Sequence, residues 1–170
     1  MTPTSVTLRP AMIEDAASIA AIFGHYVTHT VISFQETAPS TADWAQRIDT
    51  AAAEAMPFLV AETTGGVVGY AYASPWKTYA GYRHTIEDSV YVDHAHVGRG
   101  VGRALLEALI RECRSAGYEQ MIAVISLTPN VGTASIELHR RLGFGDVGTL
   151  RKVGSKHGHR IDTHVMQLEL

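Results

Sequence analysis

The stretch SVYVDHAHVGRGVGRALLEALI, residues 89–110, joins three sequence patterns that together decide the fold. Alternating apolar residues at its start are typical of a strand, and apolar residues spaced three and four apart at its end are typical of a helix. Between them, Gly98, Gly100 and Gly102 alternate with Arg and Val. A glycine-rich turn before a helix exposes backbone N–H groups beside the positive end of the helix dipole, so this stretch predicts an anion-binding site.

Two common phosphate-binding motifs fit the stretch poorly. A Walker loop places Lys and then Ser or Thr after its last glycine, whereas Arg103 and Ala104 follow Gly102. A dinucleotide fingerprint needs G-x-G-x-x-G after the first strand of a parallel array, whereas this stretch has G-x-G-x-G in the middle of the chain. On spacing alone, an ordinary strand-to-helix loop is the competing interpretation.

The rest of the sequence predicts one α/β domain over residues 1–170. We expect helices at residues 13–27, 37–48, 103–116 and 134–142, and strands at residues 5–11, 57–62, 67–74, 84–93, 120–126, 145–153 and 162–170. The second helix begins with Ser40 and Asp43 at the spacing of a capping box. The second and third strands are expected to form a hairpin, and one strand–helix–strand crossover is expected from Thr85 to Ser126.

Composition excludes several classes of protein. The 170 residues are 46% hydrophobic and 18% charged, which is typical of a globular domain large enough to bury a core. The formal net charge of −3 gives no electrostatic footprint for nucleic acid, and the single cysteine, Cys113, precludes an internal disulfide. Neither a secretory signal nor an apolar run of 18 residues is apparent. We therefore expect a cytoplasmic protein that binds neither nucleic acid nor membranes.

The chain resembles the GNAT superfamily of N-acetyltransferases in three consecutive segments. Residues 89–110 look like its pyrophosphate-binding segment, residues 134–144 (ASIELHRRLGF) look like its second signature, and residues 116–126 (AGYEQMIAVIS) match the strand between them. The resemblance runs nearly end to end. It implies the GNAT fold, a mixed and mostly antiparallel sheet flanked by helices, with a splayed central strand pair.

Within the superfamily, the chain is most similar to the phosphinothricin and methionine sulfoximine acetyltransferase group. The segments that carry this similarity are residues 32–40 (ISFQETAPS), 81–92 (GYRHTIEDSVYV) and 153–170 (VGSKHGHRIDTHVMQLEL). The group is dimeric, and its counterpart of residues 155–162 lies near the active site of the neighbouring subunit, so a homodimer is implied. The implied acceptor is the α-amino group of a small amino-acid analogue, attacked directly without a covalent enzyme intermediate.

The resemblance implies acetyl-CoA as the co-substrate. In the family, loop amides hold the pyrophosphate of CoA, and the free edge of the preceding strand binds the pantetheine arm as an added strand would. An N–H group on that edge also polarises the thioester carbonyl. We expect these contacts from the strand residues Val90, Tyr91 and Val92 and from the loop residues Val97, Gly98, Arg99, Gly100, Val101, Gly102 and Arg103.

One part of the second signature departs from the group. The group usually carries Asn three residues before the signature Ser, which is Ser135 here, but Gly132 occupies that position. Asn130 stands five residues before Ser135. Either Asn130 reaches the cofactor from a reshaped loop, or that hydrogen bond is lost; we assign Asn130 and Ser135 to the cofactor site.

Two titratable residues are candidates for catalysis. Amide formation needs a neutral amine, so a base must remove a proton, and the Glu of the resembling group at the position of Glu87 is its proposed base. Burial would raise the pKa of such a carboxyl group, whereas the competing interpretation is a strand carboxylate that faces solvent. Asp88 should then point to the opposite face and have a structural role.

His139 is the second candidate. Many GNAT enzymes place a Tyr five residues before the final Phe of the second signature, to stabilise or protonate the departing CoA thiolate. His139 occupies that position relative to Phe144, and an imidazole can donate a proton at neutral pH. The competing interpretation is a histidine on a helix surface among basic residues.

Four residues are candidates for acceptor binding: Phe34, Lys77, Tyr82 and Arg83. Arg83 is the first choice for a carboxylate or head group, because its planar guanidinium can bind two oxygens at once. The competing interpretation is a surface ion pair with Glu or Asp. Other acceptors, such as a peptide N-terminus, a polyamine or an aminoglycoside, are alternatives. A non-catalytic sensor that binds acyl-CoA is the alternative from another functional class.

No metal site is expected from the sequence. His94 with His96 and His157 with His159 have a strand-like spacing, but no third ligand follows at a recognisable distance. Cys113 falls on the apolar stripe of its predicted helix, so we expect it in the core rather than as a nucleophile.

Overall fold

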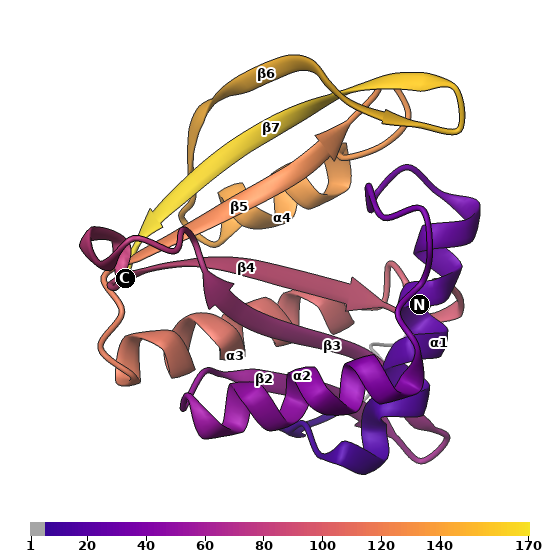
Figure 1. Ribbon diagram of the computed structural model, residues 1–170, viewed down its shortest axis with the longest axis vertical. Coiled ribbons are helices and arrows are strands. Elements are labelled where there is room, and N and C mark those ends of the chain that lie inside the picture. Colours follow the sequence, from indigo (N-terminus) through magenta and orange to yellow (C-terminus); the bar gives the residue numbers. More distant parts are fainter. Residues whose placement is uncertain (1–5) are drawn as a thin grey trace.

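The computed structural model describes residues 6–170, which form a seven-stranded sheet with helices on both faces (Figure 1). The strand order is β1-β2-β3-β4-β5-β7-β6, and neighbouring strands are antiparallel except for the parallel pair β4 and β5. The strands are β1 (Thr7–Pro10), β2 (Phe58–Thr63), β3 (Gly66–Pro75), β4 (Thr85–Val92), β5 (Gln120–Leu127), β6 (Gly145–Lys156) and β7 (His159–Glu169). The expected mixed, mostly antiparallel sheet is confirmed.

The helices largely follow the sequence-based expectations. They are α1 (Ala16–His29), α2 (Thr41–Ala53), α3 (Val101–Ser115) and α4 (Thr133–Arg141), with 3-10 turns η1 (Ile13–Asp15), η2 (Ala80–Tyr82) and η3 (His94–His96). The predicted capping box of α2 is confirmed: the Asp43 N–H donates to Ser40 Oγ at 3.1 Å, and the Ser40 N–H donates to Asp43 Oδ2 at 2.7 Å. The expected hairpin β2–β3 and the crossover β4–α3–β5 are also present.

The two ends of the chain differ from the expectation in detail. Ser5, the first residue of the predicted strand, and the start of the segment searched for a secretory signal lie outside the described residues. At the other end, β6 and β7 are longer than predicted and meet at a tight turn in which His157 and Gly158 both have positive φ, 50° and 76°. Such values suit a two-residue hairpin, but His is rare at such a position, so the residue types indicate this turn only weakly.

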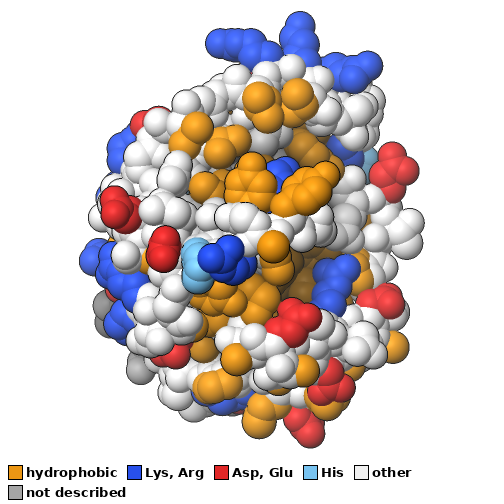
Figure 2. All heavy atoms as spheres, turned by 60° about the vertical axis from the view of Figure 1, so that its left-hand side comes forward, with side chains coloured by type: hydrophobic (Ala, Val, Ile, Leu, Met, Phe, Trp, Pro, Cys, Tyr) orange, Lys and Arg blue, Asp and Glu red, His pale blue; other side chains and the backbone are white. Residues whose placement is uncertain are grey.

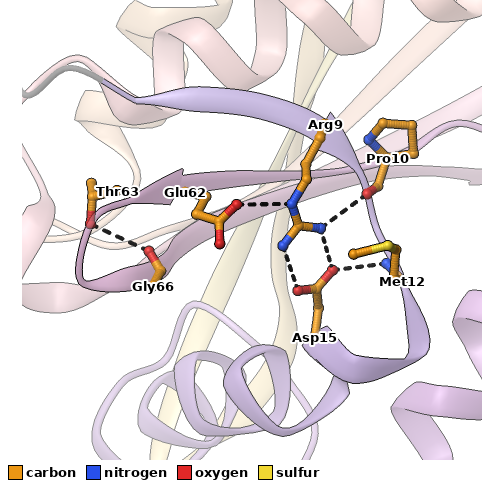
Figure 3. Close-up of polar contacts among 7 residues, drawn as sticks. All are labelled: Arg9, Pro10, Met12, Asp15, Glu62, Thr63 and Gly66. Atoms are coloured by element: carbon orange, nitrogen blue, oxygen red, sulfur yellow. Dashed lines mark hydrogen bonds and ion pairs between the residues drawn. The ribbon is translucent and has the colours of Figure 1, made fainter.

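Arg9 anchors the start of the first helix to the sheet (Figure 3). Its Nη1 and Nη2 donate to the two Asp15 oxygens at 2.7 and 2.8 Å, and its Nε donates to Glu62 at 2.9 Å. The Asp15 carboxylate also accepts the Met12 N–H at 2.8 Å. The bidentate pair therefore fixes the direction in which the chain leaves β1 and enters α1.

A separate apolar cluster lies on each face of the sheet. One is formed by α3 with the strands beneath it, and the other joins α1 and α2 to β2 and β3 through Phe23, Trp44 and Tyr70. Cys113 lies in the first cluster, where burial raises the pKa of its thiol to about 12. Its expected place in the core is confirmed. Within residues 6–170, no helix is both long and apolar enough to cross a membrane.

The parallel strands β4 and β5 separate after three residue pairs. Thr85 pairs with Gln120, Ile86 with Met121 and Glu87 with Ile122, although both strands are eight residues long. Beyond Glu87, β4 stays with β3 while β5 stays with β7, and the two diverge (Figure 1). The predicted splayed strand pair is confirmed, and Glu87 is the last residue of β4 before the gap.

Candidate active site

A cavity of about 380 Å³ opens where β4 and β5 separate. Its lining comes from β4, β5, α1, α4 and the loops beside them. The lining residues are Tyr26, Ile32, Glu87, Asp88, Ser89, Val90, Tyr91, Val92, Val97, Ala123, Val124, Ile125, Ser126, Gly132, Ala134, Ser135, Leu138 and His139. On the face of the molecule in Figure 2, apolar side chains lie in the hollowed parts, and acidic and basic side chains are both scattered around them.

The β4 edge that faces the gap carries free backbone groups. The Thr85 carbonyl accepts the Trp76 N–H at 3.2 Å, and the Asp93 N–H donates to Val68 at 2.8 Å, so both face β3. Because hydrogen-bonding direction alternates along a strand, Val90 and Val92 present their backbone groups to the gap. The Tyr26 hydroxyl donates to the Val92 carbonyl at 2.5 Å. Val90 is therefore the more open position for an added strand-like ligand.

Tyr91 occupies a different place from its two neighbours in the predicted edge. The same alternation turns its backbone groups toward β3, where it pairs with Tyr70. Its ring packs edge-on against Phe23 at 5.0 Å between centroids. The Tyr91 side chain thus forms part of the cavity wall, while the edge is presented by Val90 and Val92.

The glycine loop ends at an α3 N-terminus with free N–H groups. Gly98 and Gly100 have positive φ of 74° and 85°, which explains glycine at both positions. The Ala104 N–H donates to the Gly100 carbonyl at 3.0 Å and begins the helical bonding, so the preceding N–H groups of α3 have no acceptor within the helix. They are the donors that an anion would take up.

Gly102 needs a different explanation. It has no positive φ, and a Cβ there would make ordinary contacts of 3.5 Å with Val92 and 3.7 Å with Leu138. The fold therefore does not require glycine at this position. The absence of a side chain at this first-turn position leaves the backbone N–H groups open to close approach by a ligand.

The loop before α4 explains the departure from the family signature. Gly132 has φ of 100°, and a Cβ there would collide with the Ser126 carbonyl oxygen, so Asn cannot occupy this position without moving the loop. Asn130 is exposed, its backbone N–H donates to Thr128 Oγ1 at 3.3 Å, and it is not among the cavity-lining residues. Ser135 borders the cavity beside His139.

Glu87 lies half-buried in the cavity wall, which is not the setting of a strand carboxylate that simply faces solvent. Burial raises the pKa of its carboxyl group, and the negative charge of Asp88 raises it further. The Lys77 ammonium opposes both effects by lowering the pKa. The net pKa is above the ordinary value of a glutamate, so the carboxylate is a stronger base than an exposed glutamate.

His139 and Asp88 form a buried pair on the other side of β4. Asp88 Oδ2 lies 3.1 Å from His139 Nε2, and His139 Nδ1 lies 2.7 Å from the Ser135 carbonyl oxygen. The exposed fractions of Asp88 and His139 are 8% and 4%. The alternative of a histidine on the helix surface is therefore wrong. The expected opposite face of Asp88 is consistent with this contact, and the residue also borders the cavity.

The chain matches known proteins in both sequence and fold. The sequence model of the "Acetyltransferase (GNAT) family" matches residues 23–144. The chain belongs to the GNAT acetyltransferase family. An acetyltransferase structure from Salmonella typhimurium, solved with its cofactor acetyl-CoA, superposes on this chain with a TM-score of 0.93. The two sequences are 38% identical, and the match covers 98% of this chain and 95% of the Salmonella chain. The expected GNAT fold is confirmed.

Curated relatives of this GNAT enzyme have names that agree with the group identified from the sequence. Phosphinothricin N-acetyltransferase of Alcaligenes faecalis is 40% identical over 164 residues, which are 96% of this chain and 82% of that protein. L-methionine sulfoximine/L-methionine sulfone acetyltransferase of Pseudomonas aeruginosa is 40% identical over 167 residues, 98% of this chain and 95% of that protein.

The four predicted acceptor residues of this GNAT enzyme lie outside the cavity lining. Phe34 packs against Gly154 of β6, so closely that a Cβ on Gly154 would collide with its ring. Lys77 lies 4.5 Å from the centre of the Trp76 ring, close enough to Glu87 to affect its pKa. Tyr82 and Arg83 are exposed in the segment that leads into β4.

Arg83 does not form the surface ion pair that was its competing interpretation. Its Nη1 donates to the Ala80 carbonyl at 3.1 Å, and within residues 6–170 no carboxylate lies at ion-pair distance from it. Tyr26, Ser89 and the β5 side of the cavity are not among the site residues predicted from the sequence, and Asp88 is predicted there only in a structural role. Only the strand-like pattern of residues 120–126 could have indicated the β5 side.

Proposed function

We propose that this GNAT enzyme transfers an acetyl group from acetyl-CoA to the α-amino group of a small amino-acid analogue, such as phosphinothricin or methionine sulfoximine. The observation that carries the proposal is the arrangement of one cavity with Glu87 on one side of β4 and the Asp88–His139 pair on the other. The names of the two relatives support the class of acceptor.

The residues present fit acetyl-CoA. When bound, acetyl-CoA supplies an activated acetyl thioester. The free N–H groups at the start of α3 suit the pyrophosphate, and the lack of a side chain at Gly102 allows it to come close. The backbone groups of Val90 suit an extended amide-containing arm. Asp88 Oδ1 is buried without a hydrogen-bond partner within residues 6–170, so a ligand in the cavity that supplied a donor would remove a free-energy cost.

Glu87 acts as the base in this proposal. Its raised pKa lets the carboxylate accept a proton from an amine that is mostly protonated at neutral pH, directly or through water. The amine then attacks without a covalent enzyme intermediate. The N–H of Val90 is the edge donor available to a developing oxyanion, since the alternation of the strand turns it toward the gap.

His139 acts as the acid, with its imidazole bordering the cavity from α4. With the base and the acid on opposite faces of one strand, the base can act on the attacking amine and the acid on the leaving sulfur without neutralising each other. A protein that only senses acyl-CoA needs neither group, and therefore the sensor alternative leaves Glu87 and His139 without a purpose.

Arg83 is the proposed partner of the acceptor's carboxylate or head group, and Lys77, Tyr82 and Phe34 are proposed to contact the rest of the acceptor. Among the described residues, no carboxylate pairs with Arg83, so its guanidinium is available to bind the acceptor. Polyamines and aminoglycosides favour acidic clefts, whereas acidic and basic side chains are interspersed on the face in Figure 2.

An acceptor screen with acetyl-CoA tests the proposal. Release of the CoA thiol should be fast with L-phosphinothricin and L-methionine sulfoximine, and mass spectrometry should show one added acetyl group on the α-amine. Fast turnover of peptide N-termini or polyamines, with neither analogue acetylated, would contradict the proposed acceptor class. Absence of turnover with every amine, despite tight acetyl-CoA binding, would favour the sensor.

A further inference from the structure

We propose that Asp88 is a positioning residue that shares one proton with His139 and keeps the imidazole ready to donate it. The role of that proton, which is to protonate the sulfur that leaves during acetyl transfer, rests on the proposed function. The sharing of the proton between Asp88 and His139 does not depend on it. The inference comes from the hydrogen-bonding partners of the two side chains.

The first step is the assignment of the proton on Nδ1. His139 Nδ1 lies 2.7 Å from the Ser135 carbonyl oxygen, and a carbonyl oxygen only accepts hydrogen bonds. Nδ1 therefore carries a proton and donates. A neutral imidazole with its proton on Nδ1 has an unprotonated Nε2.

The second step concerns the other ring nitrogen. His139 Nε2 lies 3.1 Å from Asp88 Oδ2, and both side chains are buried. An unprotonated Nε2 and an ionised carboxylate would be two acceptors facing each other. The contact therefore holds one proton, either as an imidazolium with a carboxylate or as a neutral imidazole with a carboxylic acid.

The surroundings favour the charged form of the pair. Burial lowers the pKa of His139, but the hydrogen bond and the charge of Asp88, with the Ser135 carbonyl, raise it more, so the net pKa lies above 6.5. Other titratable groups near Asp88 are Glu87 and Tyr91 on β4 and Cys113 on α3. The β5 residues on the cavity wall are uncharged.

The shared proton balances the acetyl transfer. Glu87 takes one proton from the ammonium form of the acceptor and passes it through water to solvent, so that the neutral amine can attack. Glu87 then takes the second proton, which nitrogen loses as the amide forms, and as the carbon–sulfur bond breaks its electron pair stays on sulfur. That sulfur receives the proton held between Nε2 and Oδ2, which leaves a neutral imidazole beside the Asp88 carboxylate. Transfer of the proton from Glu87 through water restores the pair, so each cycle begins with the same protonation.

A direct test measures the titration of the His139 imidazole by NMR in the free protein, so no acceptor is needed. The wild-type midpoint should lie above 6.5. In Asp88→Asn, which keeps the side-chain shape but removes the charge, the midpoint should fall by about one to three pH units. Asp93→Asn is the matched control, because Asp93 pairs with His96 at 3.1 Å and not with His139, so its loss should leave the His139 midpoint unchanged.

The outcomes separate the two proposals. A wild-type midpoint below 6.5, or an unchanged midpoint in folded Asp88→Asn, would overturn the shared proton without requiring any variant to be active. If the midpoint shifts as expected but neither amino-acid analogue is acetylated, the shared proton stands and the acceptor proposal fails. In the active enzyme, the alkaline limb of the kcat profile should move to lower pH in Asp88→Asn, with little change in KM for acetyl-CoA. The double variant, with both Asp88→Asn and His139→Asn, should lose less kcat than the product of the fold-losses measured in the two single variants.

Discussion

Glu87 and Asp88 are adjacent on β4, project to opposite faces of the sheet, and border the same cavity. Consecutive strand residues normally serve separate environments because their side chains alternate between faces. Here the pairing of β4 with β5 ends at Glu87, and the gap beyond it connects the two faces. The splayed strand pair therefore lets two neighbouring carboxylates serve one site from two sides.

Glu87→Gln should make the protein more stable at neutral and alkaline pH. The folded-state pKa of Glu87 is raised, so folding favours the protonated form, and stability falls as pH rises from the unfolded pKa of 4.5 through the folded value. Gln does not ionise, so the variant does not lose this stability as the pH rises. Thermal unfolding should show a higher Tm for the variant at pH 8, with a difference that narrows toward pH 4.5. Equal Tm values at pH 8 would show that the carboxylate is not destabilised by its site.

Gly102→Ala should weaken acetyl-CoA binding without harming the fold. The new methyl group fits against Val92 and Leu138 but occupies the space beside the N–H groups at the start of α3. Gly102 is a better test than Gly100, whose positive φ would strain any other residue. Calorimetry should show at least roughly tenfold weaker affinity with a nearly unchanged Tm. Gly65→Ala, in the β2–β3 turn and without positive φ, is the control; equal affinities in both variants would contradict the loop assignment.

Arg83→Ala should raise KM for the amino-acid analogue far more than for acetyl-CoA. The lost guanidinium would otherwise bind two acceptor oxygens, a contact with a charged group worth about 1.5–3 kcal/mol. Steady-state kinetics with each substrate varied in turn gives both constants. Arg111→Ala, at an exposed position on α3, should leave both KM values unchanged. A similar acceptor KM in the Arg83 and Arg111 variants would remove Arg83 from the acceptor site.

The protein should be a homodimer in solution. The edge strand β6 exposes three apolar side chains, Val147, Leu150 and Val153, with exposed fractions of 61%, 55% and 58%. An uncovered edge of this kind invites association. Light scattering should give about twice the 18.4 kDa of one chain, and Leu150→Lys with Val153→Lys should shift the mass toward the monomer. A single-chain mass for the wild type at working concentration would refute the dimer.

Local patterns in the sequence were enough to predict the elements and the side of the strand on which each carboxylate lies. The Ser40–Asp43 cap, the glycine loop and the alternation of Glu87 with Asp88 all depend on residues close together in the chain. The contact between Asp88 and His139 spans 51 residues, and that between Tyr26 and Val92 spans 66. No local period encodes such contacts, because they depend on how α1 and α4 dock on the sheet.

Two details of the loops were also beyond the sequence patterns. Gly132 is explained by the nearby Ser126 carbonyl, which belongs to β5, and not by its own neighbours in the chain. In β6, Lys152 has a positive φ of 56° where the pairing with β7 shifts between Leu150 and Gly154. Propensity alone ends the strand near this point, whereas pairing with β7 carries it on to Lys156.

The central claim is that Glu87 removes the proton from the acceptor amine, and the pH dependence of kcat in wild type and Glu87→Gln with L-methionine sulfoximine tests it most directly. Near neutral pH the variant should lose about 10²- to 10⁴-fold in kcat while binding acetyl-CoA with unchanged affinity. The loss should shrink as pH rises, because the free amine becomes abundant and needs no base. A variant with wild-type kcat near neutral pH would contradict the claim, as would a loss of the same size at every pH.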